Sequence, residues 1–535
     1  MGKLKILLVT GKLAGPLVKE VLGKSKTPHR VDVMVLPVSV IVLLSTENIA
    51  EQLSRMGIKK DMYDLIIIPG GCRGSAKIIE EYTGIPAVKG PVHANDLPLI
   101  FELDDPSKYL SPDKPADEVI RGRIIARNIK LLKELEDSLS PENGIAIGNI
   151  IVPQNPPPIR IISEIVDAHL LSENSIIDRV HRYIDDGADI VSIGFEAETP
   201  HPDKVYRIIR SIKKEVDVPI AIDSLIPSEI IKAVEAGVDL VLSIDLSNID
   251  KVSSYVMDTP CVFIPYDHSR RYLPKDPIER TSLLARIVSR GRSLGIKYII
   301  ADLILEPPII GDSFKTLYMY SLFKETHPKI PMLIGSGNIV ELMDVDSIGV
   351  NALLVMFAME IGISLVLTVE KSVKAQGSTR EIAIASQMAS LSYLRKTPPK
   401  DLGIDLLILK DKRRITMPIE KDGAETVIVK GYRTEYKLDP MGIFKIRVDY
   451  KDRYIDALYI GKKGKILIRG RSAEEISKYI VDNGLVSMLS HAIYLGRELA
   501  KAEEALRINK NYYQERPLFV IRKPLRVKRI AYKED

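Results

Sequence analysis

The chain has 535 residues, a length that predicts about three or four domains. Its content of 45% hydrophobic and 27% charged residues is ordinary for a globular protein, and the net charge of +5 is too small to indicate general nucleic-acid or membrane binding. The two cysteines, Cys72 and Cys261, lie far apart and outside any CxxC motif, which excludes a disulfide framework and a cysteine-rich zinc or iron–sulfur site.

The first part of the chain alternates buried-strand patterns with helical patterns. Strands are predicted at 5–10, 31–36, 65–69 and 86–89, and helices at 13–22, 47–56 and 117–138. Continuous apolar strands alternating with helices are typical of a small parallel sheet covered on both faces, so we predict an N-terminal α/β domain over residues 1–148. The glycines of TGKLAG and PGGCRG, after the first and third strands, indicate either tight βα turns or a phosphate cradle.

A regular repeat of strand and helix follows a proline-rich segment. Residues 149–158 hold four prolines and few helix formers, which predicts a linker. Beyond it, strands are predicted at 159–165, 190–194, 219–223, 240–244, 261–265, 298–302, 332–335 and 365–368, each followed by a helical pattern. Eight evenly spaced βα units predict a closed (β/α)₈ TIM barrel over residues 155–396 rather than an open doubly wound sheet.

Two further segments complete the predicted architecture. Residues 348–369 are apolar enough to imitate a membrane span, but Asn351 and Glu360 would be costly in lipid, so we predict a buried helix followed by a buried strand. Residues 402–535 are predicted to form an α+β domain. Its strands are predicted at 405–409, 426–429, 443–449, 455–460 and 466–468, and its helices at 473–483 and 485–508.

Polar residues stand at the carboxyl ends of several barrel strands, where the loops of a TIM barrel build the active site. They are Glu164, Asp167, Asp223, Ser243, Asp245, Asp302 and Asn338. Each could serve as a helix cap, but their convergence on one end of the barrel favours a binding site. Carboxylates and amides without a phosphate loop or lysine cluster suit a ligand that donates hydrogen bonds, such as a 2-amino-4-oxo pterin.

Three segments resemble the pterin-binding superfamily of dihydropteroate synthases and corrinoid-dependent methyltransferases. They are GADIVSIGFEAETP, VPIAIDSLIPSEIIKAVEAGVDLVLSID and YIIADLILEP. The resemblance covers about residues 159–395, and the whole chain resembles the archaeal group called dihydropteroate synthase-related proteins. It implies that Asp223 and Asp302 hold the pterin, because both branches of the superfamily place an aspartate at each position.

The motifs of the synthase branch are not matched in this chain. IVDAHL stands where a synthase would carry Asn-x-Thr-x-Asp-Ser-Phe, GSGN stands in place of Ser-Arg-Lys, and Thr368-Val369-Glu370 in place of Arg-x-His. In the synthases these groups hold a departing pyrophosphate. Their replacement argues against condensation of a pterin pyrophosphate with an arylamine.

The methyltransferase branch is the better match. IGSGNIVELMDVDSIGVNALLVMFAMEIGIS is similar to its Gly-Leu-Ser-Asn segment and following helix, which implies that Asn338 acts near N5 of a methyl-pterin. IISEIVD is similar to its first strand, with Glu164 kept and Asp167 in place of an asparagine. On the fourth strand Leu242 falls near a pterin-binding asparagine of both branches. Candidates to substitute for it are Ser243, Asp245 and Asn248.

These patterns together predict a cytoplasmic, homodimeric enzyme that transfers a one-carbon (methyl) group. The expected carrier is tetrahydromethanopterin or a related reduced pterin of the tetrahydrofolate type, and a corrinoid held by a partner protein is one candidate acceptor. The histidines show no HxH or HExxH spacing, so no catalytic zinc site is expected. Neither nucleic acid nor membrane is an expected partner. The alternatives are a synthase-like condensation and a non-catalytic pterin-binding scaffold.

Overall fold

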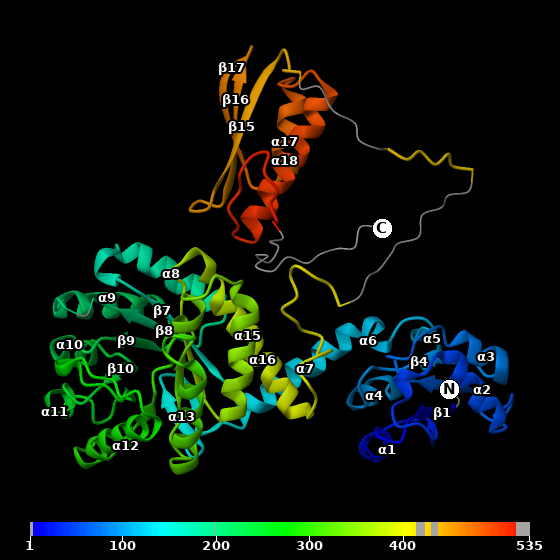
Figure 1. The fold of residues 1–535 in the computed structure, drawn as a ribbon, viewed down its shortest axis with the longest axis horizontal. Helices are drawn as coiled ribbons and strands as arrows, with labels where there is room; N and C mark the ends of the chain where they lie inside the picture. Colours follow the sequence, from blue (N-terminus) through cyan, green and yellow to red (C-terminus); the bar gives the residue numbers. More distant parts are fainter. Residues whose placement is uncertain (1–3, 197, 413–422, 430–436, 521–535) are drawn as a thin grey trace, which may run out of the picture. The chain divides into compact units, whose positions relative to one another are not determined.

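The computed structural model describes residues 4–196, 198–412, 423–429 and 437–520 (Figure 1). The chain divides into two compact units, residues 1–412 and 413–535. The first unit contains a small parallel sheet and the barrel, and the second contains an antiparallel sheet with two helices. The predicted fold class is confirmed, while the three-domain boundaries stay a prediction.

The N-terminal region is a parallel sheet of four strands in the order β2-β1-β3-β4. Its strands are β1 (Lys5–Thr10), β2 (Arg30–Val35), β3 (Leu65–Ile68) and β4 (Ala87–Lys89). Its longer helices are α1 (Gly15–Lys24), α2 (Thr46–Arg55), α3 (Lys77–Thr83) and α7 (Arg121–Asp137). Separate apolar clusters cover the two faces of the sheet, one built on Ile6, Leu8 and Leu65 and the other on Leu7, Val9 and Ile66. This is the two-sided burial that continuous apolar strands predict.

The predicted linker at 149–158 is wrong, because its first half is a strand. β5 (Gly144–Ile147) and β6 (Ile150–Pro153) form an antiparallel hairpin. Ile147 and Val152 of the hairpin are fully buried among the first inward-facing residues of the barrel strands. The hairpin therefore closes the amino-terminal end of the barrel. The prolines indicated an irregular segment, but the burial of β-branched side chains decided the structure.

Eight parallel strands form the barrel, with helices around the outside (Figure 1). The strands are β7 (Arg160–Ile165), β8 (Ile190–Gly194), β9 (Ile220–Asp223), β10 (Leu240–Ile244), β11 (Cys261–Phe263), β12 (Ile299–Ala301), β13 (Leu333–Gly335) and β14 (Leu365–Val369). The ring closes through a parallel bridge between Ala301 and Met332, which joins β12 to β13. Every predicted barrel strand is present, within two residues at either end.

Helices α8 to α16 connect the barrel strands. Those of eight residues or more are α8 (Glu173–Asp185), α9 (Pro202–Glu215), α10 (Pro227–Glu235), α12 (Pro277–Ser293), α13 (Ser313–Thr326), α15 (Ser347–Ile361) and α16 (Ser378–Arg395). Short helices α11 (Ile249–Val252) and α14 (Gly337–Val340) follow β10 and β13. The apolar stretch at 348–369 forms α15 and β14, as predicted. Over the described residues no helix is both long and apolar enough to cross a membrane.

A buried ion pair joins the N-terminal region to the last barrel helix. Arg395 at the end of α16 places a guanidinium nitrogen 2.6 Å from Asp96, and their side chains are 3% and 1% exposed. Arg127 of α7 lies 3.3 Å from the same aspartate. The side chain of Asn95 donates a hydrogen bond to the backbone carbonyl of Arg395. These contacts explain why residues 1–412 form one compact unit.

The C-terminal unit is a three-stranded antiparallel meander with two helices packed on it. Its elements are β15 (Gly442–Asp449), β16 (Tyr454–Gly461), β17 (Gly464–Gly470), α17 (Ala473–Asp482) and α18 (Leu489–Arg507). The strands predicted at 405–409 and 426–429 are wrong, because both segments are irregular and largely exposed. Each has apolar residues without a neighbouring strand to pair with, and a lone strand is not stable.

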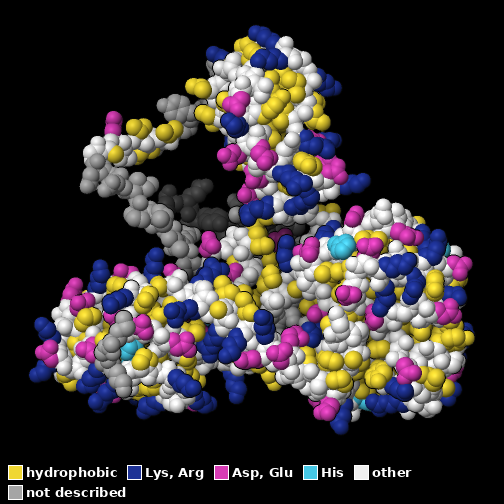
Figure 2. Space-filling model, turned by 180° about the vertical axis from the view of Figure 1, so that it is seen from behind, with side chains coloured by type: hydrophobic (Ala, Val, Ile, Leu, Met, Phe, Trp, Pro, Cys, Tyr) yellow, Lys and Arg dark blue, Asp and Glu magenta, His cyan; other side chains and the backbone are white. Residues whose placement is uncertain are grey.

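Charged side chains of both signs are mixed on the face of the molecule that Figure 2 shows. Many lysines and arginines lie within ion-pair distance of acids, including Lys24 with Glu20, Arg290 with Asp250 and Lys297 with Asp258. A protein that binds nucleic acid through its phosphates concentrates positive charge in a patch or stripe. On this face the positive side chains are instead interspersed with negative ones.

Candidate functional site

A cavity of about 380 Å³ opens at the carboxyl ends of the barrel strands. Its polar lining includes Glu164 from β7, Asp223 from β9, Asp302 after β12 and Asn338 on α14. Ile304, Leu305, Leu342, Leu367 and Val369 supply apolar walls. The lining contains no lysine or arginine. An apolar cleft with a few convergent polar groups is the usual form of a small-molecule site.

The side chain of Glu164 packs against Gly194, the last residue of the neighbouring strand β8. Only a residue without a side chain leaves space for the carboxyl at this position. A Cβ atom built on Gly194 would lie 2.1 Å from Oε1 of Glu164. Burial, with the nearby charges of Asp223 and Asp167, raises the pKa of Glu164 well above its ordinary value. The carboxyl therefore holds a proton under conditions in which an exposed glutamate would be ionised.

The two aspartates also have raised pKa values. Burial raises the pKa of Asp223 to about 7, and the charge of Asp302 adds to the rise. Burial raises the pKa of Asp302 to about 6, although hydrogen bonds from Tyr320 and from the backbone N–H of Ile304 oppose the rise. The Ile304 nitrogen lies 2.7 Å from Oδ1 of Asp302. Near neutral pH the cavity thus contains both protonated and ionised carboxyls, which can donate and accept hydrogen bonds.

Asn338 lies in the first turn of α14 and is exposed toward the cavity. Its Nδ2 donates a hydrogen bond to the backbone carbonyl of Leu305 at 2.5 Å. This bond links the loop after β12 to the loop after β13. The side chain does not cap α14, whose N-cap residue is Ser336.

Asp167 lies at the rim of the mouth and not in the lining of the cavity. Its backbone adopts a left-handed conformation at φ 54°, and its carboxylate lies 2.9 Å from Nζ of Lys371. The side chain is 41% exposed. Lys371 is therefore already paired with an acid at the rim.

Ser243, Asp245 and Asn248 organise the loop after β10 instead of lining the cavity. Asp245 is fully buried, and its carboxylate accepts hydrogen bonds from backbone N–H groups of Ser247, Asn248 and His268. Asn248 is 1% exposed, and its amide bonds the backbone of Asp245, Ser243 and Leu225. The polar groups of both side chains are thus used within the protein.

Several residues that shape the site were not predicted from the sequence. Tyr320 of α13 is fully buried and donates a hydrogen bond to Asp302, and Gly194 makes room for Glu164. Glu341 lines the cavity and accepts a hydrogen bond from the backbone N–H of Ser372. The helical pattern of α13 indicates that one face is buried, but not that a hydroxyl on it meets an aspartate.

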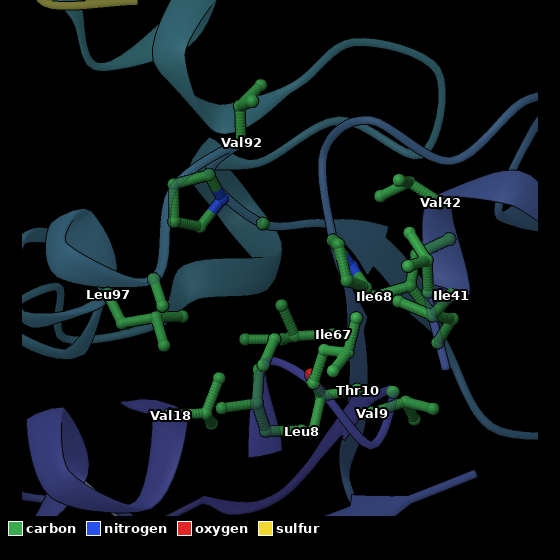
Figure 3. A pocket seen from close by; sticks show the side chains of 18 of the residues that line it. Leu8, Val9, Thr10, Val18, Ile41, Val42, Ile67, Ile68, Val92 and Leu97 are labelled. Atoms are coloured by element: carbon green, nitrogen blue, oxygen red, sulfur yellow. The ribbon is translucent and has the colours of Figure 1, made fainter. Parts of the chain in front are cut away.

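A second, smaller cavity of about 160 Å³ lies in the N-terminal region (Figure 3). Its walls are mainly apolar side chains such as Leu8, Ile67 and Leu97, around the carboxyl ends of β1 and β3. The glycines nearby permit close backbone packing: a Cβ on Gly11 would lie 2.9 Å from a backbone nitrogen, and one on Gly70 would lie 2.4 Å from a carbonyl oxygen. These glycines were predicted to mark either tight βα turns or a phosphate cradle, and the close packing supports the tight turns.

Models of three protein families match separate parts of the chain. The model described as "Pterin binding enzyme" matches residues 163–276 in the barrel. The model described as "PterinBD-DUF4346" matches residues 438–515 in the C-terminal unit. A model described as "Family of unknown function (DUF6513)" matches residues 4–92 in the N-terminal sheet.

One whole-chain relative and several solved structures are also similar to this chain. An uncharacterized protein of Methanocaldococcus jannaschii is 35% identical over 528 residues, which cover 97% of this chain and 99% of the relative. A Yersinia pestis dihydropteroate synthase in complex with a sulfonamide drug is 14% identical, covering 44% of this chain and 94% of its own, with a TM-score of 0.36. A Coxiella burnetii dihydropteroate synthase in complex with pteroic acid is 21% identical with the same coverages and a TM-score of 0.35.

Proposed function

Because the chain belongs to the family of the Methanocaldococcus jannaschii relative and, through its barrel, to the pterin-binding superfamily, we propose that the carboxyl-lined cavity binds a reduced pterin. We further propose that the enzyme transfers the one-carbon group of this pterin. The proposed carrier is tetrahydromethanopterin or a tetrahydrofolate-type relative. The observation that carries the proposal is the meeting of Glu164, Asp223, Asp302 and Asn338 in one cavity.

The carboxyls suit the hydrogen-bonding edge of a pterin. An ionised carboxylate accepts from the 2-amino group and a ring N–H together, and a protonated one donates to a ring nitrogen or to the 4-oxo group. The cavity offers both forms near neutral pH, because the pKa values of Asp223 and Asp302 are about 7 and about 6. The apolar walls supplied by Leu305, Leu342 and Leu367 suit the faces of a planar ring.

Asn338 is the group that we propose to act on the reacting end of the pterin. The bond to Leu305 uses one of the two N–H groups of its amide and orients the side chain. The carbonyl oxygen is suited to accept a hydrogen bond from N5–H as that nitrogen gains a proton and becomes a better leaving group for the methyl. A hydrogen-bonding group held in place before the reaction lowers the barrier because it needs no reorganisation.

Synthase-like condensation is the first alternative, and the lining of the cavity argues against it. A departing pyrophosphate requires cationic groups, and neither lysine nor arginine lines the cavity. Lys371 at the rim is paired with Asp167. We therefore expect pyrophosphate at millimolar concentration to leave the affinity for a reduced pterin unchanged, as measured by fluorescence titration. Clear competition would favour the condensation instead.

A pterin-binding scaffold without catalysis is the second alternative. We propose that the enzyme is a cytoplasmic homodimer and that it passes the methyl group to a corrinoid on a partner protein. Free cob(I)alamin can replace that corrinoid as the acceptor in an assay. The test combines titration with a methylated reduced pterin and the change of the cobalamin spectrum on methyl transfer. Binding with transfer supports the enzyme, and binding without transfer to cob(I)alamin or to a corrinoid protein supports the scaffold.

The affinity for the pterin should decrease as pH falls through the pKa of Asp223. That pKa is about 7, so the carboxylate is ionised at pH 8 and largely protonated at pH 6. If the ionised form accepts the pterin N–H groups, the dissociation constant rises about tenfold between those two values. Titration calorimetry across this range measures it. A profile that is equally flat for the native protein and for Asp223→Asn would contradict the proposed contact.

A further inference from the structure

Two histidines and a glutamate from separate stretches of the chain meet at the carboxyl end of the barrel. His169 lies in the loop after β7, Glu196 follows β8, and His201 directly precedes α9. Their candidate ligand atoms all lie within 4.8 Å of one another. Nε2 of His201 lies 2.7 Å from Oε1 of Glu196, and Nε2 of His169 lies 3.7 Å from the same oxygen.

The distances fit a metal ion with small adjustments. Zinc binds histidine nitrogen and carboxylate oxygen at about 2.0–2.2 Å, so two ligands of a tetrahedral ion stand about 3.3 Å apart. The two measured distances to Oε1 of Glu196 lie on either side of this value. The imidazole rings of His169 and His201 are stacked, with centroids 5.0 Å apart and planes at 10°. The two imidazoles therefore lie face to face, each with Nε2 near the same carboxylate oxygen.

His169 is the residue that an ordinary ion pair does not explain. Its side chain is 10% exposed, and its Nδ1 has no hydrogen-bond partner. Its Nε2, at 3.7 Å from Glu196, is beyond hydrogen-bonding distance. A buried ring nitrogen without a hydrogen-bond partner costs about 1–3 kcal/mol. An ion bound at Nε2 would give His169 a polar partner, which the contact between His201 and Glu196 alone does not supply.

The backbone around both histidines is held in place. The N–H of His201 donates to Glu229 at 2.7 Å, and Glu229 is fully buried. Nζ of Lys204 donates to the backbone carbonyl of His169. The ring of Phe195 lies 6.5 Å and 6.3 Å from the rings of His169 and His201. Metal sites in proteins depend on such support, because it orients the ligands before the ion binds.

We propose that His169, Glu196 and His201 bind one divalent transition-metal ion of the zinc type. Two imidazoles and one carboxylate select Zn²⁺, Fe²⁺ or Co²⁺ over Mg²⁺ and Ca²⁺, which prefer oxygen ligands alone. Three protein ligands leave a position open for water or for the nucleophilic atom of a substrate. The sequence does not predict this site, because its residues come from two loops, after β7 and after β8, without a metal-binding spacing.

The site borders the carboxyl cavity. Glu196 follows Gly194 by two residues, and Gly194 lies against the carboxyl of Glu164. An ion held there is at the same end of the barrel as the proposed pterin. A zinc ion with an open position makes a bound water or thiol easier to deprotonate, so the site is suited to hold an acceptor.

The test is titration of the metal-free full chain with ZnCl₂ by calorimetry and with CoCl₂ by visible absorption. We expect one ion per chain with micromolar affinity or tighter, and a cobalt spectrum of low coordination number. His169→Ala and Glu196→Gln should each weaken binding at least tenfold. His181→Ala in α8 and Glu198→Gln are matched controls, because both side chains are exposed and lie outside the cluster.

Thermal melts of all four variants separate loss of the ion from loss of the fold. Binding of less than one ion per two chains at 100 µM metal, or equal affinity in the cluster variants and the controls, would overturn the proposal. The titration uses no pterin. Its failure would therefore leave the proposed pterin function untouched, and failure of pterin binding would leave the metal site untouched.

Discussion

Asn338→Ala is expected to lower the rate of methyl transfer by about 10²–10³-fold, the usual effect of losing one preorganised hydrogen-bonding group. The affinity for the methylated pterin should change much less, because the proposed bond to N5 strengthens only as that nitrogen gains a proton. A residue used equally in the bound and transition states would raise KM and leave kcat unchanged. Single-turnover transfer to cob(I)alamin, with pterin titration beside it, separates these effects.

The fold should tolerate this substitution. Asn338 is exposed, and its bond to Leu305 joins two loops without capping a helix. Asn174→Ala is the matched control, since Asn174 is an exposed asparagine in the first turn of α8. Equal transfer rates for the native protein and both variants would show that Asn338 has no catalytic role.

Asp223→Asn should weaken pterin binding and at the same time stabilise the protein. Loss of a charge-assisted hydrogen bond worth about 1.5–3 kcal/mol lowers affinity by about tenfold or more. Asp302→Asn is expected to have a similar effect on affinity, because both carboxyls line the cavity. The gain in stability arises because Asp223 is a buried carboxyl that the folded protein prefers to keep protonated.

The sign of the stability change depends on pH. Burial raises the pKa of Asp223 from 3.8 to about 7, so folding favours the protonated form and stability falls as pH rises between these values. At pH 8 the ionised group costs up to about 4 kcal/mol, since one pKa unit corresponds to about 1.4 kcal/mol. Asp223→Asn should therefore raise the free energy of unfolding at pH 8 and not at pH 4.

Denaturant unfolding at both pH values measures this difference. Asp217→Asn is the control, because Asp217 is an exposed aspartate in the loop before β9. A variant that binds pterin normally would remove Asp223 from the proposed site. A variant that binds weakly and is destabilised at pH 8 would show a structural role for the carboxylate instead.

The regular spacing of apolar segments made the barrel predictable. A strand with both faces covered needs a continuous apolar run, and eight such runs separated by helical patterns allow few other arrangements. The hairpin of β5 and β6 was missed because the four prolines that follow Val152, at positions 153, 156, 157 and 158, suggest an irregular segment. Its burial depends on the open end of the barrel, which local sequence does not describe.

The composition of the site was partly predictable, by a geometric rule and by resemblance. Strand ends in a barrel converge, so Asp223 and Asp302 were expected to meet. The rule does not say which way a polar side chain turns once the strand has ended. Asp245 and Asn248 turn back to their own loop, because short polar side chains compete well for nearby backbone N–H groups. Tyr320 reaches Asp302 through packing alone.

The ion pair of Asp96 and Arg395 makes the N-terminal sheet and the barrel difficult to produce as separate proteins. Separate polypeptides for the N-terminal sheet and the barrel would each expose a charge that is otherwise buried against its partner. In a chimera that buries one member without the other, the unpaired charge costs about 3–5 kcal/mol. We expect the two fragments to recover stability only by reassociating, so exchange of this sheet between unrelated barrels would be opposed by a mismatch of charge.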